Sequence, residues 1–152
     1  GISPKENREL PPLRHEMVHE LKREFPELTI VINGGFKTSE EIEAQLAVVD
    51  GVMIGREAYH HPWSMTEWDA RFFGAPGEAR DRDAIEAEMV AYMQRATAAG
   101  EPWTHVSRHL LGLRNGLPGA RRWRQVWSDH RLKQEPPHAV SRLARDAAAA
   151  LA

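Results

Sequence analysis

Two short apolar runs, each followed directly by glycine, constrain this fold more than any other feature. The first is residues 28–32, LTIVI, which leads into Asn-Gly-Gly at 33–35. The second is residues 52–54, VMI, which leads into Gly-Arg at 55–56. A run that is apolar at every position, rather than at alternate ones, is typical of a parallel strand buried on both faces. The sequence therefore predicts two parallel strands that each end at a glycine corner.

Helices are predicted around these strands. Residues 11–25 open with paired prolines and carry apolar residues at helical spacing. Residues 38–49 begin with Thr38 and Glu41, which have the spacing of a capping box, and residues 56–60 read as a short helix. Helix, strand, helix, strand and short helix, joined by short connections, is the order of a parallel α/β fold.

After residue 62 the pattern is helical only. A segment rich in glycine and proline at 74–77 reads as a linker. Further helices are predicted at 63–73, 81–99, 104–113, 120–133 and 137–151. We therefore predict an α/β plus all-α chain, with an α/β domain over residues 1–64 and a helical bundle domain over residues 65–152.

The glycine corners are candidates for a phosphate site. Ligands of parallel α/β folds bind at the carboxyl ends of the strands, and glycine lets backbone N–H groups approach an anion closely. A short helix that starts with an arginine adds positive charge beside the second corner. The candidate phosphate-binding residues are Gly34, Gly35, Gly55 and Arg56. The alternative is that these glycines only make tight turns.

The same order of elements matches the phosphate site of a TIM (β/α)8 barrel, which lies after strands 7 and 8 and before a short extra helix. Such a barrel needs about 200 to 250 residues and eight strands. This chain has 152 residues and only two predicted strands, so it cannot close a barrel by itself. We predict that it holds the last two βα units of a barrel and is the carboxyl-terminal part of a longer protein.

Charge is distributed unevenly along the chain. Residues 1–100 contain 11 Lys and Arg against 18 Asp and Glu, whereas residues 101–145 contain nine against three. A basic segment of this kind predicts a surface that binds a polyanion. Arg121, Arg122 and Arg124 crowd the start of one helix, where like charges repel each other unless an anion lies among them. The alternative is an exposed, solvated arginine face.

Composition excludes several classes of protein and of site. Charged residues make up 28% of the chain, and no apolar run has the roughly 18 residues of a membrane span, so we expect a globular protein without a membrane segment. Cysteine is absent, which excludes disulfides and a cysteine nucleophile from this chain and agrees with a cytoplasmic location.

Histidine and tryptophan pairs have structural interpretations that we favour over functional ones. The histidines at 15 and 19 and at 105 and 109 have the i, i+4 spacing that can bind zinc, and residues 15–19 read His-Glu-Met-Val-His. We nevertheless predict no metal site, because histidines and carboxylates at this spacing are common on helices without a metal. The later pair is expected to add partial positive charge to the surface that binds a polyanion. The tryptophans at 123 and 127, like those at 63 and 68, are expected to pack in a core rather than to stack on bases.

Several runs resemble one known family. SPKENR at 3–8, IVINGG at 30–35 and GVMIGREAY at 51–59 resemble the carboxyl-terminal half of tRNA-dihydrouridine synthases of the A subfamily. HVSRHLLGL at 105–113 and GLPGARRWR at 116–124 resemble the helical tRNA-binding domain of the same subfamily. The first and last of these runs are the most specific, because Gly-Gly and Gly-Arg corners occur in other FMN barrels too.

The resemblance implies an enzyme that holds FMN at the mouth of a barrel and uses NADPH to reduce it. The reduced flavin gives hydride to a flipped-out uridine of the tRNA D-loop, and a cysteine donates the proton. By motif match, the residues at the FMN phosphate are Asn33, Gly34, Gly35, Gly55 and Arg56. The residues against tRNA are Lys5, Arg8, Arg121 and Arg124. Because the chain has no cysteine, the catalytic acid is missing, and we expect the chain alone to be inactive.

Two other functions stay open. One is a non-enzymatic RNA-binding module whose α/β segment is only a scaffold. The other is a different FMN or sugar-phosphate barrel enzyme with an unrelated helical tail. Binding of flavin and of tRNA distinguishes these functions. The RNA-binding module predicts salt-sensitive binding of tRNA without a flavin site. The different barrel enzyme predicts no salt-sensitive affinity for tRNA.

Overall fold

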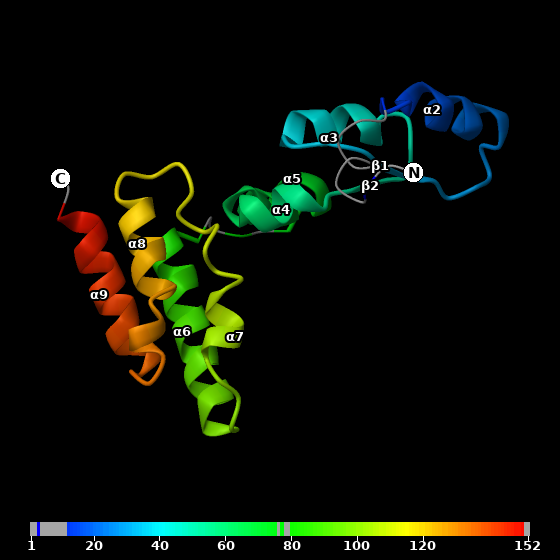
Figure 1. Cartoon of the computed structure of the whole chain (residues 1–152). Helices are drawn as coiled ribbons and strands as arrows, with labels where there is room; N and C mark the ends of the chain where they lie inside the picture. The colour runs from blue at the N-terminus through cyan, green and yellow to red at the C-terminus, as the bar shows by residue number, and fades with distance from the viewer. Residues whose placement is uncertain (1–2, 4–11, 76, 78–79, 151–152) are drawn as a thin grey trace. The chain divides into compact units, whose positions relative to one another are not determined.

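The computed structural model describes residues 3, 12–75, 77 and 80–150. The chain divides into two compact units, Gly1–Glu57 and Ala58–Ala152, here called the amino-terminal and the carboxyl-terminal unit (Figure 1). The division lies shortly before the domain boundary predicted after residue 64, which stays a prediction.

The amino-terminal unit contains helices and strands in the predicted order. Its elements are α2 (His15–Glu24), β1 (Val31–Asn33), α3 (Ser39–Leu46), β2 (Gly51–Met53) and the start of α4 (Arg56–His60). The strands pair in parallel, with Val31 opposite Gly51 and Asn33 opposite Met53. β1 starts later than the apolar run at 28–32, because only residues 31–33 have partners in the neighbouring strand.

Side-chain hydrogen bonds define the ends of these elements. The predicted capping box of α3 is confirmed: Glu41 N donates to Thr38 Oγ1 over 3.2 Å, and Thr38 N donates to Glu41 Oε2 over 3.1 Å. Before β2, Asp50 Oδ2 accepts from Ile30 N and from Lys22 Nζ, each at 2.8 Å. The backbone hydrogen bond from Ile30, followed by that from Lys22, lowers the pKa of Asp50 below its ordinary value.

One face of the sheet is buried and the other is open. Ile32 is 1% exposed and forms a small core with Phe36 and Val49. On the opposite face, Val31 is 58% exposed and Met53 is 50% exposed. The prediction that both faces are buried is wrong for this structure, because no element of the described chain covers the second face.

In the described part of the carboxyl-terminal unit, every regular element is a helix. Its elements after α4 are η1 (Pro62–Glu67), α5 (Trp68–Phe73), α6 (Arg82–Ala98), α7 (Thr104–Ser107), α8 (Ala120–Trp127), η2 (His130–Leu132) and α9 (Pro137–Ala149). No helix in the part of the chain that the structure describes is both long and apolar enough to cross a membrane.

Three predicted helices are shorter or more irregular than expected. The helix predicted at 104–113 ends at Ser107, because later amides bond three residues back, as Leu110 N does to Ser107 O at 2.9 Å. The helix predicted at 120–133 breaks after Trp127, where Asp129 Oδ1 accepts from Arg131 N and starts η2. The helix predicted at 63–73 begins as the 3₁₀-helix η1.

Tryptophans form the centre of this unit, as predicted for positions 123 and 127. Trp123 is 0% exposed and Trp127 is 3% exposed, and their rings meet edge to face at 6.2 Å. Trp103 packs against Trp127 in the same way at 5.8 Å. Met93 of α6 and Val140 of α9 complete the middle of the core. The three rings pack with these aliphatic side chains, so α6, α8 and α9 share one apolar cluster.

Gly119 permits the close packing of α8 on α9, and its replacement tests that packing. It precedes α8 with φ of +74°, and a Cβ there would lie against the backbone of Ala148. We expect Gly119→Ala to lower the free energy of unfolding by about 2–4 kcal/mol, from left-handed strain plus overpacking. Urea unfolding monitored by tryptophan fluorescence measures this. Gly116→Ala is the matched control, because Gly116 has φ of +83° but a Cβ there would have no atom within 4 Å. Only the left-handed strain should then lower its stability. Equal losses of stability in the two variants would contradict the packing explanation.

Candidate cofactor and RNA sites

The register of the sheet brings the two glycine corners together. Asn33, the last residue of β1, lies opposite Met53, the last residue of β2. Gly34 follows Asn33 directly, and Gly55 follows Met53 after one residue. Because both strands run in the same direction, both corners lie at the carboxyl edge of the sheet, where parallel α/β folds bind ligands.

The first corner depends on glycine and is held by a histidine. Gly34 has φ of +153° and Gly35 has φ of +75°, both in the region that favours glycine. A Cβ on Gly34 would lie 2.6 Å from His15 Nε2. That nitrogen is 2.9 Å from Gly34 O, and the His15 ring stacks on Phe36 with centroids 4.7 Å apart. His15 therefore positions the corner, a role that its helical i, i+4 spacing to His19 did not indicate.

The second corner is open to a ligand. Gly55 is exposed, and a Cβ there would have only Met53 Sδ nearby, at 4.0 Å. Arg56 is exposed at the start of α4 and forms no ion pair with any described residue. Since α4 has only five residues, its dipole is small, and Arg56 supplies the main positive charge. An arginine fork beside bare backbone suits a phosphate group.

The donor set fits the phosphate end of FMN. It combines glycine backbone, which permits close approach, with a guanidinium that bears no competing carboxylate among the described residues. Asn33 is exposed beside this set at the end of β1. All five predicted cofactor residues therefore lie in one unit, at one edge of one sheet.

The arginines predicted to bind RNA lie on α8. Arg121 is exposed, and Arg124 follows three residues later on the same side of the helix. Arg124 is half-buried and its Nη1 donates to Asn115 Oδ1, while Asn115 Nδ2 donates to His60 O at 2.5 Å. Asn115 thus orients Arg124. The sequence analysis missed this residue, because an Asn before Gly reads only as a turn.

Other predicted residues have different outcomes. Lys5 and Arg8 lie outside the described residues, so their contact with tRNA stays a prediction. Among the described residues, no group of three or more His, Cys, Asp or Glu side chains could hold a metal ion. His109 Nε2 accepts from Arg108 Nε at 3.0 Å and its Nδ1 lies 3.1 Å from Tyr59 Oη. The positive charge that the histidines at 105 and 109 are expected to add to an RNA face stays a prediction.

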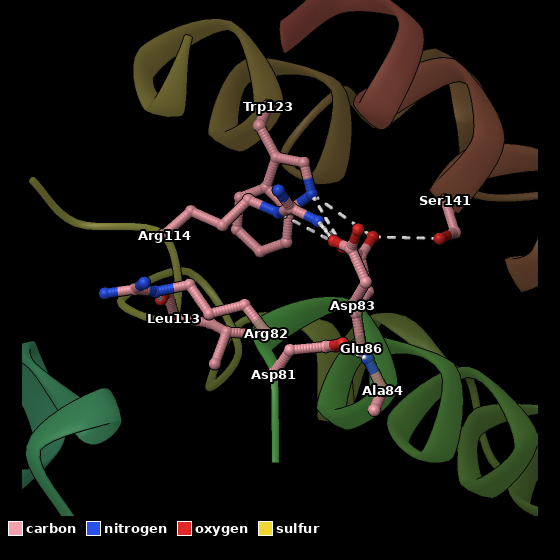
Figure 2. Close-up of polar contacts among 9 residues, drawn as sticks. All are labelled: Asp81, Arg82, Asp83, Ala84, Glu86, Leu113, Arg114, Trp123 and Ser141. Carbon is pink, nitrogen blue, oxygen red and sulfur yellow. Dashed lines mark hydrogen bonds and ion pairs between the residues drawn. The ribbon is translucent and has the colours of Figure 1, made fainter. Parts of the chain in front are cut away.

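A buried carboxylate joins four segments of the carboxyl-terminal unit (Figure 2). Glu86 on α6 is 1% exposed, and its Oε2 accepts from Arg114 Nη2 at 2.9 Å. Its Oε1 accepts from Ser141 Oγ of α9 at 2.8 Å, and Trp123 Nε1 of α8 lies 3.2 Å from both oxygens. Burial alone would lower the pKa of Arg114, but Glu86 and then Asp83 raise it above its ordinary value.

Glu86 is a structural group rather than a catalytic one. Each of its oxygens already accepts hydrogen bonds from side chains of the unit, and the side chain has almost no contact with solvent. A satisfied buried carboxylate of this kind fixes how helices pack. Sequence reasoning missed it, because an acidic residue in an Ala- and Glu-rich helix is normally exposed.

The sheet corners and the helical unit define an α/β protein with a mainly helical continuation. The profile of the family described as dihydrouridine synthase (Dus) matches residues 1–150, and the chain belongs to this family. The family consists of TIM-barrel enzymes that are generally flavin-dependent. The small parallel sheet and the helices of this chain agree with part of such an enzyme.

Individual relatives agree with this assignment. The chain is 47% identical over 140 residues to tRNA-dihydrouridine(20/20a) synthase of Pseudomonas putida, covering 92% of this chain and 42% of that protein. It is 47% identical over 133 residues to the protein of the same name from Escherichia coli K12, covering 88% of this chain and 39% of that protein. The corresponding protein of Vibrio cholerae is 45% identical over 133 residues. The chain thus spans about 40% of the length of these curated relatives.

Proposed function

We propose that this chain supplies the carboxyl-terminal region of a tRNA-dihydrouridine(20/20a) synthase, an oxidoreductase that uses FMN and NADPH to reduce a D-loop uridine of tRNA to 5,6-dihydrouridine. The observation that carries the proposal is 47% identity over 92% of the chain to a protein of that name. The glycine corners support it, because they offer a phosphate site where a flavin nucleotide needs one.

In this proposal the amino-terminal unit holds the phosphate end of FMN. Bound FMN, once reduced, supplies the hydride that saturates the C5=C6 bond of uridine. Within this chain, the backbone of Gly34, Gly35 and Gly55 approaches the phosphate, and Arg56 neutralises its charge. Asn33 lies beside them at the end of β1 and is the fifth residue of the proposed phosphate site. The proton donor lies outside this chain, which contains no cysteine.

The helical part binds tRNA in this proposal. Residues 1–64 form the end of the barrel, the last two βα units, and residues 65–152 form a helical bundle. Arg121 and Arg124 contact backbone phosphates from the bundle, and Lys5 and Arg8 contact tRNA near the barrel mouth. Phosphate contacts of this kind set the position of the RNA without reading its sequence.

A hybrid protein tests the cofactor site. The matching 140 residues of the Pseudomonas putida relative are replaced by this chain, and FMN affinity is measured by flavin fluorescence. We expect the hybrid to bind FMN and to form dihydrouridine in tRNA. Arg56→Ala should weaken FMN binding by about 10- to 100-fold, which corresponds to one charged hydrogen-bond group of about 1.5–3 kcal/mol.

The matched control is Arg23→Ala, which removes an exposed arginine from the end of α2 in the same unit. It should leave FMN affinity unchanged. Unchanged affinity in Arg56→Ala would contradict the phosphate assignment. A folded hybrid that binds tRNA but no flavin would favour the non-enzymatic RNA-binding module instead.

A further inference from the structure

A cleft of about 340 Å³ opens in the carboxyl-terminal unit at the far end of α8 from Arg121. It lies between α7, the end of α8 and η2. Its lining residues are Thr104, Ser107, Arg108, Leu111, Trp127, Ser128, Asp129, His130 and Lys133. Leu111 and Trp127 are the large apolar side chains of this lining, and the others carry hydroxyl groups, an imidazole ring or charges. The hydroxyl groups and cations are side chains that can contact phosphate oxygens.

The charge that the cleft presents is positive. Arg108 and Lys133 are both exposed, and neither forms an ion pair with any residue that the structure describes. The acidic lining residue is Asp129, and Arg131 neutralises it: Nη2 and Nε of Arg131 lie 2.7 and 3.0 Å from its two carboxylate oxygens. The side-chain and backbone hydrogen bonds from Arg131 lower the pKa of Asp129 to about 2. An anion entering the cleft therefore meets two cations that have no carboxylate partner among the described residues, and one carboxylate that is already paired. Arg108 Nε donates to His109 Nε2 at 3.0 Å, which leaves the guanidinium charge unpaired within the described chain.

The cleft continues the arginine face of α8. Arg121, Arg124 and Ser128 follow each other at spacings of three and four residues, which places them along one side of the helix. Ser128 lines the cleft directly after the last residue of α8. Seven residues of helix rise about 10 Å, so one extended strand of a polyanion can reach both Arg121 and the cleft.

We propose that this cleft is a further RNA-contact site, in which Arg108 and Lys133 bind a backbone phosphate while Thr104 and Ser128 donate hydrogen bonds to that nucleotide. The proposal rests on the proposed function, since it takes the RNA to be the tRNA held by Arg121 and Arg124. Cations and hydroxyl groups are the side chains that contact phosphate and ribose oxygens in nucleic-acid complexes. A single RNA strand thereby follows α8 from Arg121 to the cleft.

Binding of unmodified tRNA to the 152-residue chain, measured by fluorescence anisotropy over a range of salt concentrations, tests this site. The double variant Arg108→Ala/Lys133→Ala is expected to bind at least tenfold more weakly at low salt. The slope of log K against log salt should fall by about one, as for the loss of one phosphate contact. The matched control is Arg142→Ala/Arg145→Ala, which removes the same charge from exposed positions of α9 outside the cleft. It should change affinity less than twofold, and circular dichroism should show both variants folded.

Equal weakening by the two double variants would overturn the proposal, because general charge would then explain the loss. If the unchanged chain binds tRNA and loses affinity in Arg121→Ala/Arg124→Ala, but the cleft variant behaves like the control, only the cleft site fails. If the unchanged chain shows no salt-sensitive tRNA affinity, the cleft and the tRNA-binding role of this unit fail together.

Discussion

Glu86→Ala is expected to lower the free energy of unfolding of the carboxyl-terminal unit by about 3–5 kcal/mol, the range for breaking a buried charge pair from one side. The substitution leaves the Arg114 guanidinium without its buried partner, and Trp123 Nε1 and Ser141 Oγ without an acceptor. All five tryptophans lie between positions 63 and 127, so urea unfolding followed by tryptophan fluorescence reports on this unit alone.

Glu88→Ala provides the matched control for this loss. Glu88 lies on the same helix, but its side chain is 63% exposed and pairs with Arg80 at the surface. Exposed pairs contribute about 0–1 kcal/mol, so the control should change stability little. Glu86→Gln keeps the shape of the side chain and one acceptor oxygen. Its loss in the free energy of unfolding should therefore lie between those of Glu86→Ala and Glu88→Ala. Similar losses in Glu86→Ala and Glu88→Ala would show that the buried network does not hold the helices together.

Arg121→Ala/Arg124→Ala is expected to weaken tRNA binding about 100-fold, roughly tenfold for each phosphate contact, since 1.4 kcal/mol corresponds to a factor of ten. The dependence of log K on log salt should become shallower by about two. Fluorescence anisotropy with labelled tRNA at several salt concentrations measures both quantities. The loss should be similar for different tRNA sequences, because phosphate contacts carry no base information.

Two single variants sharpen this test. Arg122→Ala removes an exposed arginine from the same turn but from another side of α8, and should have a much smaller effect. Asn115→Ala keeps the Arg124 charge but removes the oxygen that orients it, so affinity should fall while the salt dependence stays nearly unchanged. If Arg122→Ala weakens binding as much as Arg121→Ala, the specific face proposed for the RNA is wrong.

Local patterns were sufficient to predict most elements of the amino-terminal unit. The two apolar runs that form the strands, the capping box at Thr38 and the short helix that starts at Arg56 each depend on residues within a few positions of each other. Helix length in the other unit was harder to predict. The segment 104–113 has helical spacing, yet only Thr104–Ser107 is helical, because tertiary packing of Leu110 and Leu113 holds the rest in successive turns.

The chemistry that the chain can offer follows from its residues alone: glycine corners after two apolar runs, an arginine cluster on one predicted helix, and no cysteine. These features depend on residue type and local spacing. Tertiary packing, by contrast, is what brings His15 to the Gly34 corner, Asn115 to Arg124, and Glu86 to Arg114 and Trp123. Each of these contacts joins residues at least nine positions apart, and such partners are chosen by packing, on which local periodicity carries no information.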